Sequence, residues 1–238
     1  MIPNIINYCW FGEKKKPKLA EKCICSWKKF CPDYEFIEWN ENNFNVNMNA
    51  YTKWCYENKK FAFLSDYVRL WVIYNNGGIY FDTDVEVIKN IDFLLENEAF
   101  FGFEKSGEDV YINTGLGFGA HKESLVVKKM LEEYSELLGG DKGTIMCPEL
   151  NTRAIKKMGF IMNGELQQID NVVVYPKDYF NPYESYIDKL SVTPNTVSIH
   201  WYTGSCLSYR IRLQGKITKI FHKFFGVNCF DFIKKILK

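Results

Sequence analysis

The chain has 238 residues, enough for one domain with a full hydrophobic core and too few for two domains of ordinary size. Hydrophobic residues make up 47% and charged residues 25%, as in ordinary globular proteins. No apolar run approaches the roughly 20 residues that span a bilayer, which excludes a membrane-spanning helix in this sequence. The net charge of +1 hides an asymmetry: residues 206–238 hold eight basic residues and one acidic residue, against 22 and 28 in the rest.

The eight cysteines contain no C-x-x-C pair, and the cysteines and histidines lack the spacing of zinc ligands. Residues 1–11 are too short for a cleavable signal, and Lys14 to Lys16 follow the apolar run instead of preceding it. We therefore expect free thiols in a protein of the reducing cytoplasm.

The first 40 residues predict a strand, a helix and a second strand. Residues 3–9 read as a short strand, and residues 17–30 place apolar side chains at helical spacing. Pro32-Asp33 ends that helix, and residues 34–39 alternate as a strand. A strand–helix–strand opening favours a parallel sheet in an α/β domain.

Residues 60–76 are the strongest helical segment, with an apolar face and a stop at Asn76-Gly77-Gly78. Ile79-Tyr80-Phe81 then predicts a short buried strand that ends abruptly in Asp82-Thr83-Asp84. The other elements that we expect are strands at 85–88, 99–103, 115–120, 172–175 and 196–201, and a helix at 122–138.

Asp82 and Asp84 are the most informative pair in the sequence. Two carboxylates at positions i and i+2 after an extended strand point the same way and can share a hard divalent cation. Such a cation can bridge a diphosphate and neutralise the charge on a leaving nucleoside diphosphate. The alternative for this short pattern is a polar turn that ends a strand.

Asp66 and Arg69 precede this pair and share one face of the expected helix, because they are three residues apart. They form either an ordinary surface ion pair or a binding pair, in which the carboxylate accepts hydroxyl groups and the guanidinium holds phosphate or sugar oxygens. Gly77 and Gly78 allow the backbone to turn tightly and to approach a ligand.

Residues 61–84 thus contain, without a gap, the pattern S-D-x-x-R, a helix, G-G-I-Y and D-x-D. This block resembles glycosyltransferase family 32, the DXD sugar transferases that include bacterial capsular and surface-polysaccharide enzymes. The segment from Ile5 to Gly12 is similar to the family's first strand, and the segment from Ile199 to Ser205 is similar to its late metal and diphosphate segment. The resemblance spans residues 1–206, with Cys206 where the family often has Trp.

The resemblance implies a GT-A fold, a Rossmann-like nucleotide-sugar-binding α/β domain with the nucleotide at the carboxyl ends of its strands, where open parallel sheets generally bind ligands. It implies catalytic roles for Asp82, Asp84 and Asn113 and a metal site of Asp82, Asp84 and His200. It implies donor contacts from Trp10 (stacked on the base), Asp66, Arg69, Gly78 and Ser205 (at the diphosphate). Glu149 is a weaker candidate for an acceptor contact, and Pro148-Glu149 equally suits a helix start.

We therefore expect a metal-dependent, retaining glycosyltransferase that uses Mn²⁺ or Mg²⁺ and moves a hexosyl group, galactose, glucose or an N-acetyl form, from a UDP-sugar. The expected acceptor is a saccharide or lipid-linked oligosaccharide in polysaccharide biosynthesis, with no nucleic-acid partner. One alternative is a non-catalytic carbohydrate-binding module. The other is a D-x-D phosphohydrolase, which would need a downstream acidic pair, and the sequence has no adjacent Asp-Asp.

The domain is expected to cover residues 1–206, followed by a basic amphipathic helical tail at 207–238. Along residues 212–225 the basic positions fall on one helical face and apolar positions on the adjacent one. Such a tail either packs on the domain or docks on an anionic membrane surface, where each basic residue contributes on the order of 1 kcal/mol. We expect residues 212–238 to place the protein on the inner face of the cell membrane.

Overall fold

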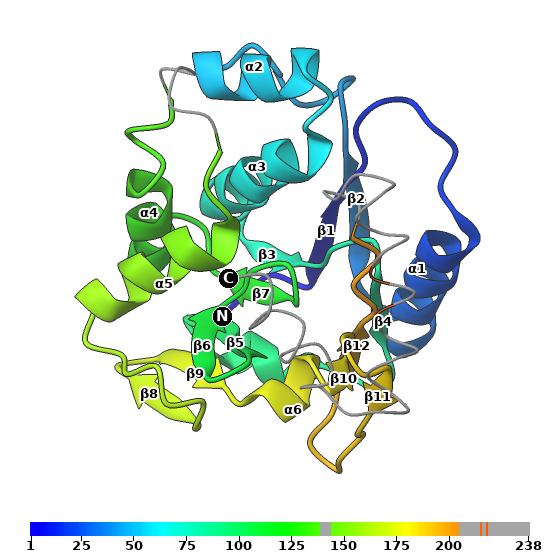
Figure 1. Cartoon of the computed structure of the whole chain (residues 1–238), viewed down its shortest axis with the longest axis vertical. Coiled ribbons are helices and arrows are strands. Elements are labelled where there is room, and N and C mark those ends of the chain that lie inside the picture. The colour runs from blue at the N-terminus through cyan, green and yellow to red at the C-terminus, as the bar shows by residue number, and fades with distance from the viewer. Residues whose placement is uncertain (139–143, 205–214, 216–217, 219–238) are drawn as a thin grey trace, which may run out of the picture.

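The fold is a mixed α/β domain built on one central sheet (Figure 1). The computed structural model describes residues 1–138, 144–204, 215 and 218. The strands of the main sheet, in the order β2-β1-β3-β7-β5-β9-β8 with β6 beside β5, are β1 (Ile5–Cys9), β2 (Glu35–Trp39), β3 (Gly78–Tyr80), β5 (Ala99–Ser106), β6 (Asp109–Ile112), β7 (Phe118–Ala120), β8 (Gln167–Ile169) and β9 (Val172–Tyr175).

Helices and two small strand pairs surround this sheet. The pairs are β4 (Val85–Val87) with β12 (Ser198–His200), and β10 (Tyr183–Glu184) with β11 (Lys189–Leu190). The helices are α1 (Lys18–Phe30), α2 (Ala50–Glu57), α3 (Phe61–Asn76), α4 (Leu125–Glu132), α5 (Cys147–Lys157), α6 (Lys177–Phe180) and the 3₁₀ helix η1 (Asp92–Glu96).

The opening of the chain forms the parallel part of the sheet. β1 pairs in parallel with β2 and with β3, as the strand–helix–strand pattern predicts. Further along the sheet, β7 pairs antiparallel with both β3 and β5, while β5 and β9 pair in parallel. The sheet is therefore mixed, and the three adjacent parallel strands β2, β1 and β3 lie on the side that leads to Asp82.

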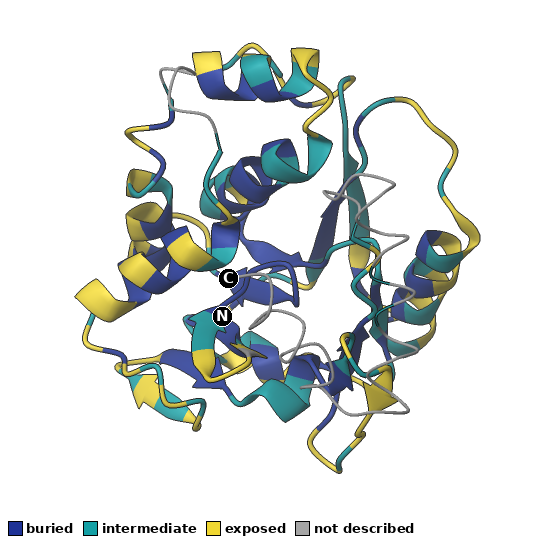
Figure 2. Cartoon of the chain, in the orientation of Figure 1, coloured by how far each residue is buried: buried dark blue, intermediate teal, exposed yellow. Residues whose placement is uncertain are grey.

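Alternate residues of each central strand contribute to two hydrophobic cores, one on each face. Tyr80 and Phe101 pack with α2, α3, α4 and α5, whereas Ile79 and Phe100 pack with α1, η1 and α6. Figure 2 shows the central strands buried and the outer faces of the helices exposed. Because both faces are covered, polar side chains that lie near the sheet gather where the strands end.

The structure departs from the expected elements in a few places. The helix expected at 122–138 begins at Leu125 and ends at Glu132, because hydrogen-bonded turns replace it from Tyr134 onward. Helix α2 was not expected; Asn49 caps it through a reciprocal hydrogen-bond pair with Thr52. Pro148 lies in the first turn of α5, so Pro148-Glu149 is a helix start, one of the two alternatives that the sequence left open. The six cysteines of the described segments are free, and five of them are buried.

The predicted tail lies almost entirely outside the described residues, which include only Gly215 and Thr218 beyond residue 204. None of the helices that the described segments form is both long enough and apolar enough to cross a membrane. The domain boundary at residue 206 and the membrane-docking role of residues 212–238 therefore stay predictions.

Gly78 is packed against the neighbouring strand, which generates a prediction about stability. Its φ is +101°, and an added Cβ would lie 2.7 Å from the carbonyl oxygen of Ile5 on β1. We expect Gly78→Ala to lower the free energy of unfolding by about 2–3 kcal/mol, since it adds a backbone clash to the cost of the left-handed conformation. Chemical denaturation measures this change.

Gly107 is the matched control, because its φ is +63° and an added Cβ would meet nothing within 4 Å. Gly107→Ala carries the backbone cost alone, about 1 kcal/mol. Equal losses at the two positions would contradict the packing role of Gly78.

Candidate donor and metal site

The candidate site lies at the carboxyl ends of β1 and β3. The parallel register of these strands pairs Asn7 with Tyr80, so Trp10 and the Asp82-Thr83-Asp84 segment leave the sheet at the same edge. The indole Nε1 of Trp10 donates to the carbonyl of Lys14 at 2.6 Å, which fixes one edge of the ring. Sequence positions more than 70 residues apart thus meet at one end of the sheet.

The strand that follows the D-x-D segment brings the late histidine to it. The amide of Val85 donates to the carbonyl of Asp82 at 3.0 Å, which turns the chain into β4. β4 pairs antiparallel with β12, and this register places His200 opposite Val85. The amide of Trp201 extends the ladder to the carbonyl of Asp84. His200 therefore lies beside Asp84 because of strand pairing.

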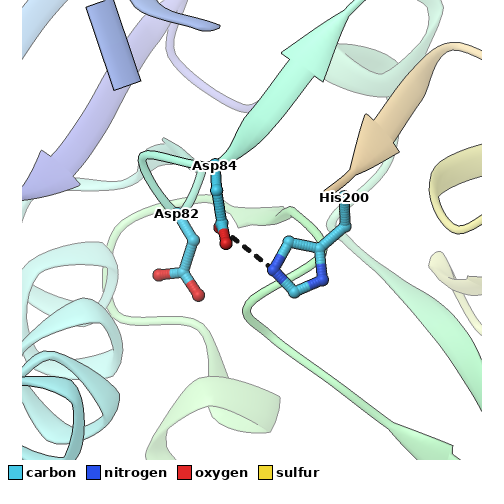
Figure 3. A group of neighbouring side chains, drawn as sticks. All are labelled: Asp82, Asp84 and His200. Atoms are coloured by element: carbon cyan, nitrogen blue, oxygen red, sulfur yellow. Dashed lines mark ion pairs between the residues drawn. The ribbon is translucent and has the colours of Figure 1, made fainter. Parts of the chain in front are cut away.

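Asp82, Asp84 and His200 form a compact group of potential ligands (Figure 3). One ligand atom from each residue lies within 4.8 Å of the others. His200 Nε2 is 3.1 Å from Asp84 Oδ1. Asp84 Oδ2 accepts hydrogen bonds from the amide and the hydroxyl of Thr203, at 2.8 and 2.7 Å. Asp84 is thus held on one oxygen by the last residue of β12 and on the other by the segment that follows it.

The charges of Asp84 and His200 stabilise each other. Burial acts to raise the pKa of Asp84, but His200 and Thr203 outweigh it and hold that pKa below its usual value. Burial acts to lower the pKa of His200, and the neighbouring Asp84 carboxylate outweighs it and raises that pKa. Asp84 is therefore an anion at any physiological pH, and it attracts positive charge to His200 or to a cation beside it.

A second group joins α3 to the end of β3. Arg69 places Nη2 2.7 Å from Asp66 Oδ1 and 3.0 Å from Asp82 Oδ1. Tyr80 donates its hydroxyl to the same oxygen of Asp82 at 3.0 Å. The open question of a surface ion pair is thereby settled, because Asp66 and Arg69 are 8% and 3% exposed. The guanidinium is shared by two carboxylates inside the protein.

Burial raises the pKa of Asp66 to about 6, although Arg69 opposes the shift. Burial likewise raises the pKa of Asp82, again against Arg69. For Arg69, burial acts to lower the pKa, and Asp82 and Asp66 outweigh it and raise it. The arginine is therefore a permanent cation that holds two carboxylates which would otherwise take up protons more readily.

Asn113 lies on the other side of Asp82. Several of its neighbours were not predicted from the sequence as site residues. Its Oδ1 accepts from the amide of Gly115 at 2.7 Å, and its Nδ2 donates to Glu104 at 2.8 Å. A Cβ on Gly115 would lie 2.6 Å from Asp82 Oδ2. The Sγ atom of Cys147 lies 3.9 Å from Nη1 of Arg69 and 3.7 Å from Oδ1 of Asn113. Isolated Glu, Gly and Cys residues carry no sequence signal for such contacts.

Two expected residues lie elsewhere, and a third is not described. Gly78 starts β3 and packs on β1, four residues before Asp82, so its close approach is to a neighbouring strand. Glu149 forms an exposed ion pair with Arg153 on the surface of α5. Ser205 falls outside the described residues.

Comparison with known proteins agrees with this geometry. Residues 17–101 match the family described as the glycosyltransferase sugar-binding region containing a DXD motif, and this span includes Asp66, Arg69, Asp82 and Asp84. Over these residues the chain is similar to the DXD-motif glycosyltransferases. The expected resemblance to this family is confirmed.

A curated relative and two solved structures give the range of the similarity. The inositol phosphoceramide mannosyltransferase 3 of Schizosaccharomyces pombe is 29% identical over 143 residues, which are 56% of this chain and 38% of that protein. The PaToxG glycosyltransferase superposes with a TM-score of 0.53 at 18% identity, over 66% of this chain and 70% of that one. A glycosyltransferase involved in the glycosylation of the major capsid of PBCV-1 superposes with a TM-score of 0.50 at 16% identity. The superposition covers 90% of this chain and 100% of that one.

These structures share the GT-A fold with this chain, and the expected fold class is confirmed. The identities of 16% and 18% concern the fold alone. This chain spans little more than a third of the length of the mannosyltransferase that it matches.

The residues present also fit a divalent cation. Two carboxylates and an imidazole are suitable ligands for Mn²⁺, and the two most distant ligands of one cation lie roughly 4–5 Å apart. The spacing within 4.8 Å meets that limit. His200 is buried, and its Nδ1 has no hydrogen-bond partner among the described residues. This set of ligand atoms is therefore suited to a cation held between Asp84 and His200, with Asp82 beside it.

The shared guanidinium makes a prediction about stability and pH. Arg69→Met leaves the buried Asp66 and the partly buried Asp82 without their counter-charge, and we expect a loss of about 3–5 kcal/mol at neutral pH. The folded pKa of Asp66 is already above its unfolded value, so ionising it costs stability as pH rises; losing Arg69 raises that pKa further. The deficit should therefore grow between about pH 5 and pH 8, as measured by urea denaturation.

Arg153→Met is the matched control, since its partner is an exposed glutamate on the same helix. It should change the free energy of unfolding by no more than about 0.5 kcal/mol at either pH. A deficit for Arg69→Met that stays flat with pH would contradict the counter-charge role.

Proposed function

We propose that this glycosyltransferase transfers a hexosyl group from a UDP-sugar to a saccharide acceptor, with Mn²⁺ or Mg²⁺ as its cation. The observation that carries the proposal is the meeting of Asp84, His200, Asp82 and Arg69 at the carboxyl edge of the sheet. A nucleoside diphosphate needs positive charge at its phosphates as it leaves. The bound cation supplies Lewis-acid stabilisation of that leaving charge.

The protein's own groups would bind and orient the donor. Asp84 and His200 hold the cation, and Arg69, itself fixed by Asp66 and Asp82, adds a permanent positive charge beside it. Such a preorganised arrangement stabilises developing charge without reorganisation during the reaction. Trp10 leaves the sheet at the same end and would stack on the base.

The reaction would retain configuration and give an α-linked product from an α-linked donor, as the family resemblance implies. The acceptor would be lipid-linked and belong to surface-polysaccharide biosynthesis. Support comes from the name of the yeast relative, whose acceptor is an inositol phosphoceramide, and from the basic and apolar pattern of residues 212–238. Those residues would hold the protein on the inner face of the cell membrane.

A non-catalytic carbohydrate-binding module is the second candidate. It would bind saccharides without nucleotide or cation, and it gives no reason for a buried arginine next to a D-x-D pair. A phosphohydrolase is disfavoured by the family match of residues 17–101.

The donor assignment is tested by thermal shift and by hydrolysis of a panel of UDP-sugars, each with and without Mn²⁺. We expect one UDP-sugar to raise the melting temperature only with the cation, and Asp84→Asn to abolish both that shift and turnover. Asp109→Asn, an exposed carboxylate on β6, is the control and should behave like wild type. Saccharide binding that ignores nucleotide and cation would instead support the binding module.

Trp10 gives a separate test of base recognition. Stacking on one base is worth about 1–3 kcal/mol, so Trp10→Ala should weaken UDP binding by roughly 5- to 150-fold, and Trp10→Phe by much less. Isothermal titration with UDP and Mn²⁺ measures the effect. Trp54→Phe, on α2, should leave the affinity unchanged. Unchanged affinity in Trp10→Ala would remove this residue from the donor site.

A further inference from the structure

Glu104 on the central strand β5 connects the two sides of the donor site. One carboxylate oxygen accepts the Nδ2 hydrogen of Asn113 at 2.8 Å, and the other accepts the hydroxyl of Tyr202 at 2.8 Å. Asn113 follows β6, and Tyr202 follows β12, so the two donors come from segments almost 90 residues apart. A single carboxylate therefore fixes both segments relative to the sheet.

The first contact determines which way the Asn113 amide faces. Its Nδ2 must point to Glu104, because a carboxylate only accepts hydrogen bonds, and its Oδ1 then points to the amide of Gly115. Gly115 packs on Asp82, since an added Cβ would lie 2.6 Å from Asp82 Oδ2. Glu104 thus orients an amide next to the D-x-D carboxylates.

The second contact holds the residue that packs on the metal-binding histidine. The ring of Tyr202 lies 4.1 Å from that of His200, centroid to centroid, and is tilted by 54°. Its backbone φ is +49°, a left-handed conformation that costs a bulky residue free energy and persists only where contacts hold it. The hydroxyl bond to Glu104 is one such contact.

We infer that Glu104 is a positioning residue for the transfer reaction, which sets Asn113 and, through Tyr202, His200 in their working places. Only the kinetic consequences of this inference rest on the proposed function. The coupling of Glu104 to Asn113 and to Tyr202 is a property of the protein without substrate. Misplacement of catalytic groups by about 1 Å can cost on the order of 100-fold in rate.

The conservative variant Glu104→Gln separates geometry from charge. A glutamine can accept from Asn113 with its oxygen and donate with its amide to the hydroxyl oxygen of Tyr202, so both contacts survive without the negative charge. We expect Glu104→Gln to keep kcat within about threefold of wild type, whereas Glu104→Ala loses roughly 10- to 100-fold in kcat with a smaller change in donor KM. Steady-state hydrolysis of the UDP-sugar with Mn²⁺ measures both.

A double-mutant cycle with Tyr202→Phe tests the coupling. Tyr202→Phe should lower the melting temperature by about 2–4 °C in wild type and by much less in the Glu104→Ala background, since the hydroxyl then has no carboxylate partner. The control is the same cycle with Tyr186→Phe, because the hydroxyl of Tyr186 bonds Glu184 on the surface. The changes in melting temperature from Tyr186→Phe and Glu104→Ala should add. Melting curves need no substrate, so they decide the coupling whether or not a UDP-sugar is the donor.

The outcomes separate the two hypotheses. If wild type ignores every UDP-sugar while the melting temperatures couple, the donor assignment fails and the link through Glu104 stands. Additive melting temperatures for Glu104 and Tyr202 would overturn the link. A loss in Glu104→Gln as large as in Glu104→Ala would also overturn the positioning role, because it would show that the charge itself acts on the substrate.

Discussion

The buried guanidinium of Arg69 is the constraint on which the site depends. It is 3% exposed and lies within ion-pair distance of Asp66 on its own helix and of Asp82 at the end of β3. It stabilises the ionised form of both carboxylates, because burial raises the pKa of each and Arg69 opposes that shift. α3 and the end of β3 must therefore keep one fixed relation, and the D-x-D segment starts from that fixed point.

The rest of the site is assembled by strand pairing around this point. The parallel register of β1 with β3 brings the Trp10 segment to the same edge, and the antiparallel register of β4 with β12 brings His200 to Asp84. Hydrophobic cores on both faces of the sheet keep these registers, since a one-residue slip would turn apolar side chains toward the wrong face. The geometry of the donor site is thus a consequence of how the sheet is packed.

The site also shows how one GT-A scaffold can serve distant relatives. The two solved glycosyltransferases share the fold at 16–18% identity, too low to carry over a substrate. In this chain the D-x-D carboxylates are surrounded by further contacts: Glu104 bonds Asn113 and Tyr202, Cys147 lies against Arg69, and Thr203 bonds Asp84. Substrate specificity generally depends on a few contacts of this kind.

The sequence by itself determined the order of the first strands and helices, the D-x-D pair at a strand end and the S-D-x-x-R helix before it, because periodicity, glycine stops and short spacings are local properties. It did not determine that Asp66 and Arg69 are buried, that Gly78 packs on β1, or that α2 exists. Apart from His200, which the family resemblance placed beside the D-x-D pair, the late residues around the carboxylates follow from the tertiary structure. Pairings between distant segments bring five residues to the site: Glu104, Gly115, Cys147, Tyr202 and Thr203. No local sequence pattern encodes such a contact, because two strands make it only after the sheet has formed.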